Sequence, residues 1–176
     1  YDILRSYEGV YESEHDGDRI ITFSEGKLYS MRSGSARYEI FPYEKDKFFF
    51  EEGVSTLQFQ RAEDNAITAV ISRGTGSDIE WKKTDRPVPE LEEIELDESI
   101  RMKYIGKYEL MPTFHISIFI TDDIMYAQAT GQDKVEIRPI EQNKFALVDV
   151  DAQLTFNMDE QGKVVSLTLY QNGEHE

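Results

Sequence analysis

One spacing in the chain is typical of nucleophilic catalysis, the Ser-x-x-Lys of Ser24-Glu25-Gly26-Lys27. That chemistry needs the serine at the start of a helix, so that the lysine lies one turn further on and takes the hydroxyl proton. Here the four residues supply the glycine that a tight hairpin turn needs, and the matching place 97 residues later reads Thr121-Asp122-Asp123-Ile124. The sequence has no Gly-x-Ser-x-Gly, His-Glu-x-x-His or phosphate-binding glycine loop. We therefore predict a turn at Ser24 and expect the chain not to be an enzyme.

Metal-binding residue types are present but do not cluster in the sequence. The three histidines, His15, His115 and His175, occupy different places in the two halves, and none has a second histidine or a cysteine nearby. The segment Glu14–Asp18 could offer oxygens to calcium, but it lacks the twelve-residue ligand spacing of calcium loops. We predict surface histidines and a solvated turn, and expect neither a metal nor a cofactor.

Six residues recur in matching positions and are the candidate contacts for a ligand or a partner: Tyr11, Glu12, Tyr29, Tyr108, Glu109 and Tyr126. The tyrosines can stack on a ligand, or they can fill a core with the hydroxyl at its edge. The core interpretation is favoured, because each tyrosine falls on a predicted strand. The two glutamates have apolar neighbours. A single carboxylate on the outer face of a strand is common, however, so a structural role is favoured for both.

The elements that position these residues form a tandem repeat with an offset of 97. Tyr7–Glu12 recurs as Tyr104–Glu109, and Glu39–Pro42 recurs as Glu136–Pro139. Between residues 2 and 79 and their counterparts, 18 of 78 pairs are identical without a single gap. The chain must therefore be interpreted as two copies of one unit.

The composition disfavours several kinds of partner and chemistry. The formal net charge is -16, from 35 acidic and 19 basic residues, which disfavours nucleic acids and anionic membranes as partners. No apolar run approaches the length of a membrane span, so we expect no membrane insertion and a soluble chain. The absence of cysteine excludes disulfides and thiolate chemistry. Ten tyrosines and ten phenylalanines give each copy enough apolar surface for its own core.

Each copy begins with an N-cap residue and apolar side chains three or four apart, in Asp2–Tyr7 and Ser99–Tyr104, which predicts a short helical turn. A glycine, Gly9 or Gly106, then starts an extended segment. Beyond it, polar and apolar residues alternate in short runs separated by turn residues. These runs are residues 20–23, 27–31, 38–41, 48–50, 56–60, 67–72 and 79–82, then 116–120, 124–128, 135–138, 145–148, 153–157 and 164–170.

The connections between the runs are too short for helical crossovers, so neighbouring strands should be antiparallel. We predict an all-β fold of two tandem small antiparallel meander barrels, each preceded by a short helical turn. The first barrel spans residues 1–84 and the second 97–176, with the acidic, proline-containing linker 85–96 between them. The first copy continues into the alternating run Ile79–Lys82, and the second has no counterpart of it. We therefore predict that the second copy lacks a final strand.

The inward positions of both barrels carry large side chains. They are Phe48, Phe50, Leu57 and Phe59 in the first copy, and Phe145, Leu154 and Phe156 in the second. Eight short strands enclose room only for side chains or one small molecule. We therefore hypothesise two packed barrels, with any binding surface outside them or between the copies.

Several stretches resemble a known family. The opening of one domain is similar to Tyr104–Leu110, and its "L-x-x-Q-x-x-G-Q" segment is similar to Met125–Gln132. Its "F-x-x-D-x-x-G-K-V … L-x-L-x-Q-N-G" ending is similar to Leu154–Val164 followed by Leu167–Gly173. This is the uncharacterised C-terminal domain that follows the catalytic domain in many beta-lactamase-related serine hydrolases. The match covers most of residues 97–174. The first copy is more divergent, and its membership rests on the repeat.

The resemblance implies a lipocalin-like barrel, and the family's hosts are mostly exported bacterial hydrolases, which implies the periplasm or the cell surface. No catalytic residue is attributed to the domain. We therefore expect a non-catalytic accessory module that packs on or gates a catalytic domain absent from this chain. The implied partner is a serine hydrolase domain, in the same chain or another. The alternatives are a free-standing lipocalin-like binding protein for a small apolar ligand, and an enzyme.

Overall fold

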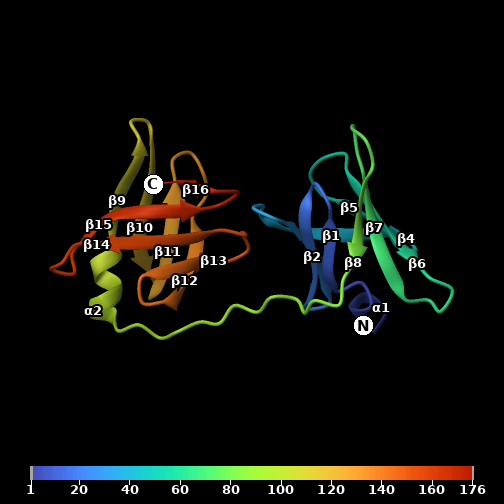
Figure 1. Cartoon of the computed structure of the whole chain (residues 1–176), viewed down its shortest axis with the longest axis horizontal. Coiled ribbons are helices and arrows are strands. Elements are labelled where there is room, and N and C mark those ends of the chain that lie inside the picture. The colour runs from blue at the N-terminus through green and yellow to red at the C-terminus, as the bar shows by residue number, and fades with distance from the viewer. Residues whose placement is uncertain (1, 176) are drawn as a thin grey trace. The chain divides into compact units, whose positions relative to one another are not determined.

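The computed structural model describes residues 2–175, and the chain divides into two compact units between Pro89 and Glu90. Each unit consists of one short helical segment followed by eight antiparallel strands (Figure 1). This confirms the predicted all-β fold class of two tandem barrels, each after a helical turn. No helix in the described part of the chain is long and apolar enough to cross a membrane.

The first unit is a closed barrel in which each strand pairs with the next one along the chain. Its elements are α1 (Asp2–Arg5), β1 (Gly9–Ser13), β2 (Gly17–Ser24), β3 (Lys27–Arg32), β4 (Arg37–Glu44), β5 (Lys47–Phe50), β6 (Thr56–Arg61), β7 (Ile67–Arg73) and β8 (Ile79–Lys83). The barrel closes where β1 pairs with β8, through Tyr11↔Lys83 and Glu12↔Lys82. Thr84 and Arg86 continue this contact, with Thr84 N–H donating to the Val10 carbonyl at 2.9 Å and Arg86 pairing with Asp18 at 2.8 Å.

The second unit is an eight-stranded sheet with the same strand order but without closure. Its elements are α2 (Glu98–Arg101), the 3-10 helix η1 (Met102–Tyr104), β9 (Gly106–Met111), β10 (Phe114–Thr121), β11 (Ile124–Ala129), β12 (Val135–Glu141), β13 (Lys144–Leu147), β14 (Gln153–Met158), β15 (Val164–Tyr170) and β16 (Glu174–His175). Part of the expected linker belongs to this unit. Ile94 N–H donates to the Pro139 carbonyl at 2.9 Å, and Leu96 packs on the core.

The prediction that the second copy lacks a final strand is wrong. Residues 174–175 form β16, which pairs with β15 through Leu169↔His175 and Tyr170↔Glu174. Asn172 and Gly173 both adopt positive φ, so this Asn-Gly pair turns the chain back onto β15. Among the described residues β16 has two, at the counterparts of Ser77 and Asp78, and β8 has five.

The turn predictions depended on residues that tolerate positive φ. Glu25 and Gly26 have φ of 51° and 83°, and Ser24 pairs with Lys27 across the turn. Ser24–Lys27 is therefore a β-hairpin, as predicted, and the helix that a Ser-x-x-Lys nucleophile needs does not form there.

One tyrosine closes the helical end of each barrel. The centre of the Tyr7 ring lies 5.1 Å from that of Phe48 and 4.7 Å from that of Phe59. The Tyr11 hydroxyl donates to the Tyr7 carbonyl at 2.6 Å. Residues 97 further on make the same contacts. The Tyr104 ring lies 5.2 Å from Phe145 and 4.5 Å from Phe156, and the Tyr108 hydroxyl donates to the Tyr104 carbonyl at 2.8 Å. The inward side chains predicted at these strands are thus core residues of both units, and apolar burial of this size dominates their stability.

The first unit adds a charged contact at the same end. The Tyr7 hydroxyl donates to Asp46 Oδ1 at 2.7 Å, and Arg61 Nε donates to the same oxygen at 2.9 Å. Hydrogen bonds from Arg61 and Tyr7 hold the pKa of Asp46 below its usual value. The second unit has Asn143 in place of Asp46 and Met158 in place of Arg61.

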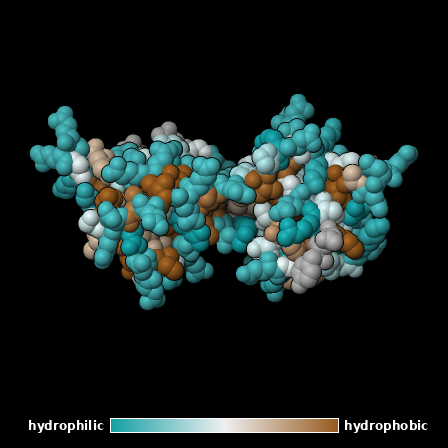
Figure 2. Space-filling model, turned by 90° about the horizontal axis from the view of Figure 1, so that it is seen from below, coloured by the Kyte–Doolittle hydropathy of each residue, from teal (hydrophilic) through white to brown (hydrophobic). Residues whose placement is uncertain are grey.

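Polar residues cover most of the surface in view, with hydrophobic residues in smaller groups between them (Figure 2). This distribution follows from the alternation along each strand, which directs one side chain inward and the next outward.

The separate cores predict that the first unit folds alone. Residues 1–89 should unfold in one cooperative transition with a β-type circular dichroism spectrum, because their core and barrel closure need no residue beyond Pro89. Urea denaturation of this fragment beside the full chain checks the prediction. An unfolded fragment, in conditions where the full chain is folded, would show that the two units share one core.

Asp46→Asn should lower the free energy of unfolding of the first unit by about 1–3 kcal/mol at pH 7, since it weakens charge-assisted hydrogen bonds from Tyr7 and Arg61. Because the folded-state pKa of Asp46 is depressed, its contribution is complete above the unfolded-state pKa and is lost as the pH falls through the folded-state pKa. The difference from wild type should therefore shrink between pH 5 and pH 2. Glu44→Gln, at an exposed pair with Lys47, is the control and should change stability by less than about 0.5 kcal/mol. Equal stabilities of wild type and Asp46→Asn at pH 7 would contradict the assignment.

Candidate ligand-binding site

A pocket opens at the end of the first barrel that lies away from α1. Its volume is about 270 Å³. We call it the Arg19 pocket, and its lining residues are Arg19, Ser30, Arg32, Ser35, Tyr38, Phe50, Glu52, Ser55 and Ser72. These positions come from the start of β2, the end of β3, the start of β4, the end of β5 and the end of β7, or from turns beside them. In an antiparallel meander, all of these strand ends meet at one end of the barrel.

Arg19 is a buried cation in this pocket, with 3% of the residue exposed. Arg19 lies on the same face of β2 as Ile21 and Phe23, the face that points into the barrel, so its side chain occupies a core position. Its Nη1 donates to the Ser30 hydroxyl at 2.7 Å. Its Nε has no hydrogen-bond partner, and no carboxylate within residues 2–175 forms an ion pair with it. Buried charges are normally paired, so Arg19 is a polar group whose partners are incomplete.

The indole of Trp81 supports the charge of Arg19. The guanidinium carbon of Arg19 lies 4.2 Å from the centre of the indole ring, and that of Arg32 lies 5.4 Å from the same ring. Both distances are typical of cation–π contacts. The indole Nε1 is also buried without a partner in the described residues.

Arg32 adds a second positive charge at the rim. Its only ion pair among the described residues is long, with Nη2 at 3.6 Å from Asp16 Oδ1. Burial and the charge of Arg32 lower the pKa of Arg19 to about 9, so the Arg19 guanidinium is still protonated at pH 7. The pocket therefore holds two cations against the exposed carboxylate of Glu52.

Aromatic rings and hydroxyls form the remaining walls. Tyr38 and Phe50 meet edge to face with ring centres 6.4 Å apart, and Tyr38 is more than half exposed. The serines at positions 30, 35, 55 and 72 add hydroxyl groups. A few polar groups beside an apolar wall are typical of a small-molecule site. The described lining residues include no histidine or cysteine that would activate a serine.

Seven of the nine lining positions are apolar in the second unit. Arg19 corresponds to Ile116, Ser30 to Ala127, and Arg32 to Ala129. Tyr38, Phe50, Ser55 and Ser72 correspond to Val135, Leu147, Ala152 and Leu169. The two polar counterparts are Gln132 for Ser35 and Asp149 for Glu52. Because Ile116 and Ala127 are buried in an otherwise matching core, the fold does not require charge or hydroxyls at these places.

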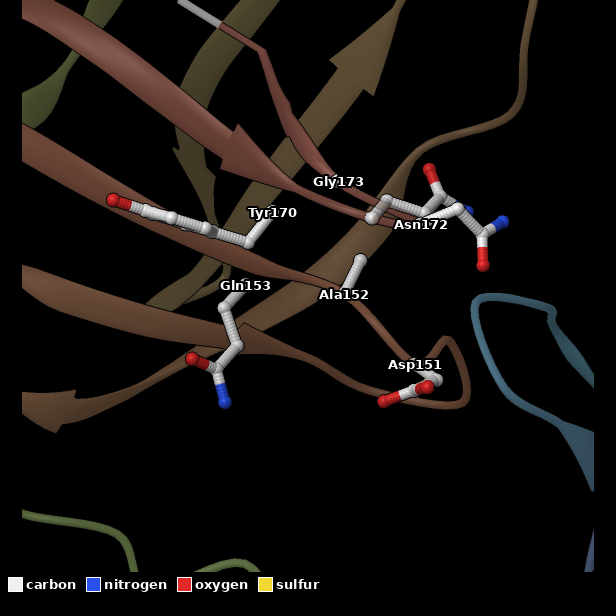
Figure 3. A pocket seen from close by; sticks show the side chains of 7 residues that line it. Asp151, Ala152, Gln153, Tyr170, Asn172 and Gly173 are labelled. Atoms are coloured by element: carbon white, nitrogen blue, oxygen red, sulfur yellow. The ribbon is translucent and has the colours of Figure 1, made fainter. Parts of the chain in front are cut away.

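The pockets of the second unit have a different character. One of about 360 Å³ lies beside β9, the strand at one edge of the sheet. It is lined by Leu110, Met111, Phe114, Leu169, Gln171 and His175. Another of about 400 Å³ is lined by Asp151, Ala152, Gln153, Tyr170, Gln171, Asn172 and Gly173. Figure 3 shows the labelled side chains of this second pocket spread out, with Tyr170 and Gln153 on one side of the view and Asn172 on the other. Neither pocket has a buried cation in its lining.

The structure places the six candidate contacts outside the Arg19 pocket and does not bring them together. Tyr11 and Tyr108 are core residues, and burial raises their pKa, that of Tyr108 to about 12. Glu12 lies at 3.5 Å from Arg86 on the exterior, and Glu109 is exposed on β9.

The other two candidates are partly buried tyrosines with a cation over the ring. The guanidinium carbon of Arg37 lies 4.3 Å from the centre of the Tyr29 ring. The Nζ of Lys134 lies 4.0 Å from the centre of the Tyr126 ring. None of the six, therefore, contributes to the pocket.

The histidines are dispersed as well. His15 is exposed in the turn between β1 and β2, while His115 contacts Thr130 Oγ1 through Nδ1 at 2.9 Å. His175 belongs to the 360 Å³ pocket. Within residues 2–175, no three His, Cys, Asp or Glu side chains gather as a metal site would need.

Sequence analysis missed Arg19 and Arg32, although a signal for them was present. Arg19 stands two residues before Ile21 and four before Phe23, which places a charge in the inward phase of a strand. The repeat puts an isoleucine at the same place. One copy thus has a charged residue at an inward-facing position where the other copy has an apolar residue. This indicates that the charge serves a function and is not needed for folding.

Arg19→Met should make the ligand-free first unit more stable by about 1–2 kcal/mol, because it replaces a buried charge without an anionic partner by an apolar side chain of similar length. Arg73→Met is the matched control. Its guanidinium is half exposed and pairs with Asp78 at 3.0 Å, so its removal should change stability by less than about 0.5 kcal/mol. Urea denaturation of both variants measures this. A loss of stability in Arg19→Met would show that the charge supports the fold.

Comparison with known families bears on the second unit. Residues 90–175 match a family model described as a domain of unknown function (DUF3471). No curated protein matches the chain. The second unit is thus similar to an uncharacterised domain, as its sequence predicted, and the match covers the unit with the apolar counterpart of the Arg19 pocket.

Proposed function

We propose that the chain is a non-catalytic binding module whose first barrel takes a small molecule in the Arg19 pocket. The observation that carries this proposal is Arg19 itself. It is a buried guanidinium without an ion-pair partner in the described residues, and it lines a pocket of about 270 Å³. Incomplete pairing at a buried charge is typical of a site that a ligand completes.

The arrangement of the barrel supports a ligand of limited size. Eight strands leave room for side chains or one small ligand. Towards α1 the interior is filled by Tyr7, Phe48 and Phe59, while the far end contains the pocket. In the far half Trp81, Arg19 and Ser30 are buried, and the pocket lies at the end of the barrel beside them.

The pocket also changes the expected chemistry of the ligand. The sequence favoured an accessory role, with a carrier of a small apolar ligand as the alternative. Arginine and serine side chains in the lining instead favour a ligand with polar groups beside an apolar portion. Four points stay predictions from the resemblance. They are a role next to a serine hydrolase domain, export to the periplasm or cell surface, a barrel of the lipocalin-like kind, and membership of the first copy in the same family.

The test is a fragment screen on the full chain. A library of neutral, cationic and anionic fragments should contain binders that perturb the amide signals around Arg19 and Ser30 and the indole signal of Trp81, which is the only tryptophan in the chain. The reason is that Arg19, which lines the pocket, has an Nε without a hydrogen-bond partner in the described residues. Two-dimensional ¹H–¹⁵N spectra locate each binder. A library with no binder there, or with binders only in the second unit, would refute the proposal.

A further inference from the structure

We infer that the Arg19 pocket is a carboxylate site, which takes a small organic acid through its carboxylate and packs the body of the acid against Tyr38 and Phe50. This inference rests on the proposed function and specifies the class of ligand.

The charge distribution supports an anion. The chain has 35 acidic and 19 basic residues, so a cation has many potential partners. Arg86, Arg61 and Arg138 each lie within 2.8 Å of a carboxylate oxygen. Arg19 has none, and the pair between Arg32 and Asp16 is long, at 3.6 Å. Two adjacent guanidinium groups therefore share no close carboxylate among the described residues, and a ligand carboxylate would supply one.

The guanidinium of Arg19 is held in one orientation before any ligand arrives. The Trp81 ring lies against it at 4.2 Å, and Ser30 accepts from Nη1 at 2.7 Å. A guanidinium presents its N–H groups in a planar fork that matches the two oxygens of a carboxylate. An oriented fork loses little conformational entropy when it binds, which favours a planar carboxylate over a spherical anion.

The dimensions limit the rest of the ligand. About 270 Å³ suits a short or single-ring acid, and the edge-to-face rings of Tyr38 and Phe50 offer it an aromatic wall. A long aliphatic chain has no path along the barrel axis, because Tyr7, Tyr11, Phe48 and Phe59 fill the other half. The hydroxyls of Ser55 and Ser72 can bind polar substituents on the body.

The experiment compares acids with uncharged molecules of the same shape. Formate, acetate, butyrate, benzoate and 4-hydroxybenzoate are titrated into the full chain at pH 7, beside the matching amides, and Trp81 fluorescence and calorimetry report binding. The tightest acid should bind at least ten times more tightly than its amide. Inorganic phosphate, as a second kind of anion, should bind more weakly than that acid.

Variants assign the effect to the guanidinium. Arg19→Met and Arg19→Lys should each weaken binding of the tightest acid at least tenfold, since the first removes the charge and the second removes the planar fork. Arg73→Met removes the same charge from an exposed position of the same unit and should leave the affinity within twofold. Circular dichroism and the unfolding transition confirm that each variant is folded.

The outcomes separate this inference from the proposed function. If acids and amides bind equally, if phosphate binds more tightly than every acid, or if both Arg19 variants keep the wild-type affinity, the carboxylate site is refuted while a small-molecule site remains. The same holds if only neutral or cationic fragments bind in the pocket. If neither the acids nor the fragments bind there, both claims fail.

Discussion

The structure depends on the alternation of side chains along strands that form a closed, narrow barrel in the first unit and an open, barrel-like sheet in the second. Every second residue points into an interior that holds one layer of side chains, so each inward position either contributes to the core or interrupts it. In both units, a tyrosine after the helical turn packs on two phenylalanines and accepts a hydrogen bond at its carbonyl from the next tyrosine. This shared contact closes one end of each unit. The copies differ around it in Asp46 and Arg61, and they differ again at the opposite end, in the lining of the Arg19 pocket.

The difference at that end concerns chemistry rather than fold. The second unit has Ile116, Ala127 and Ala129 where the first has Arg19, Ser30 and Arg32, and its backbone follows the same strand order. The first unit also has Trp81 on β8, whose ring contacts both arginines, and β8 pairs with β1 to close the barrel. A buried charge lowers stability unless something compensates it, and natural proteins retain such residues mainly where function needs them. One copy thus fits the role of a scaffold with a packed interior, and the other combines the same scaffold with a polar site.

Much of the fold could be predicted because its signals are local. Glu25-Gly26 turns the chain with positive φ, and the runs between turns alternate with period two. The Asn172-Gly173 turn and the short strand after it were missed. The pairing of Tyr11 with Lys83 could not be predicted, because closure joins residues that no local pattern relates. The six tyrosines and glutamates chosen from the repeat are exterior or core residues, since recurrence in both copies selects what the fold needs. The Arg19 pocket differs between the copies, so a search for recurrence could not find it.

The number of ligand sites per chain tests this account most directly. Isothermal titration of the full chain with the tightest ligand from the screen should give one site. A variant with the second unit's residues at three positions, Arg19→Ile, Ser30→Ala and Arg32→Ala, should give none, because the second unit folds with those residues and lacks the charges. Two sites in the wild-type chain, or one site retained by the folded triple variant, would contradict the claim that the first barrel is the specialised copy.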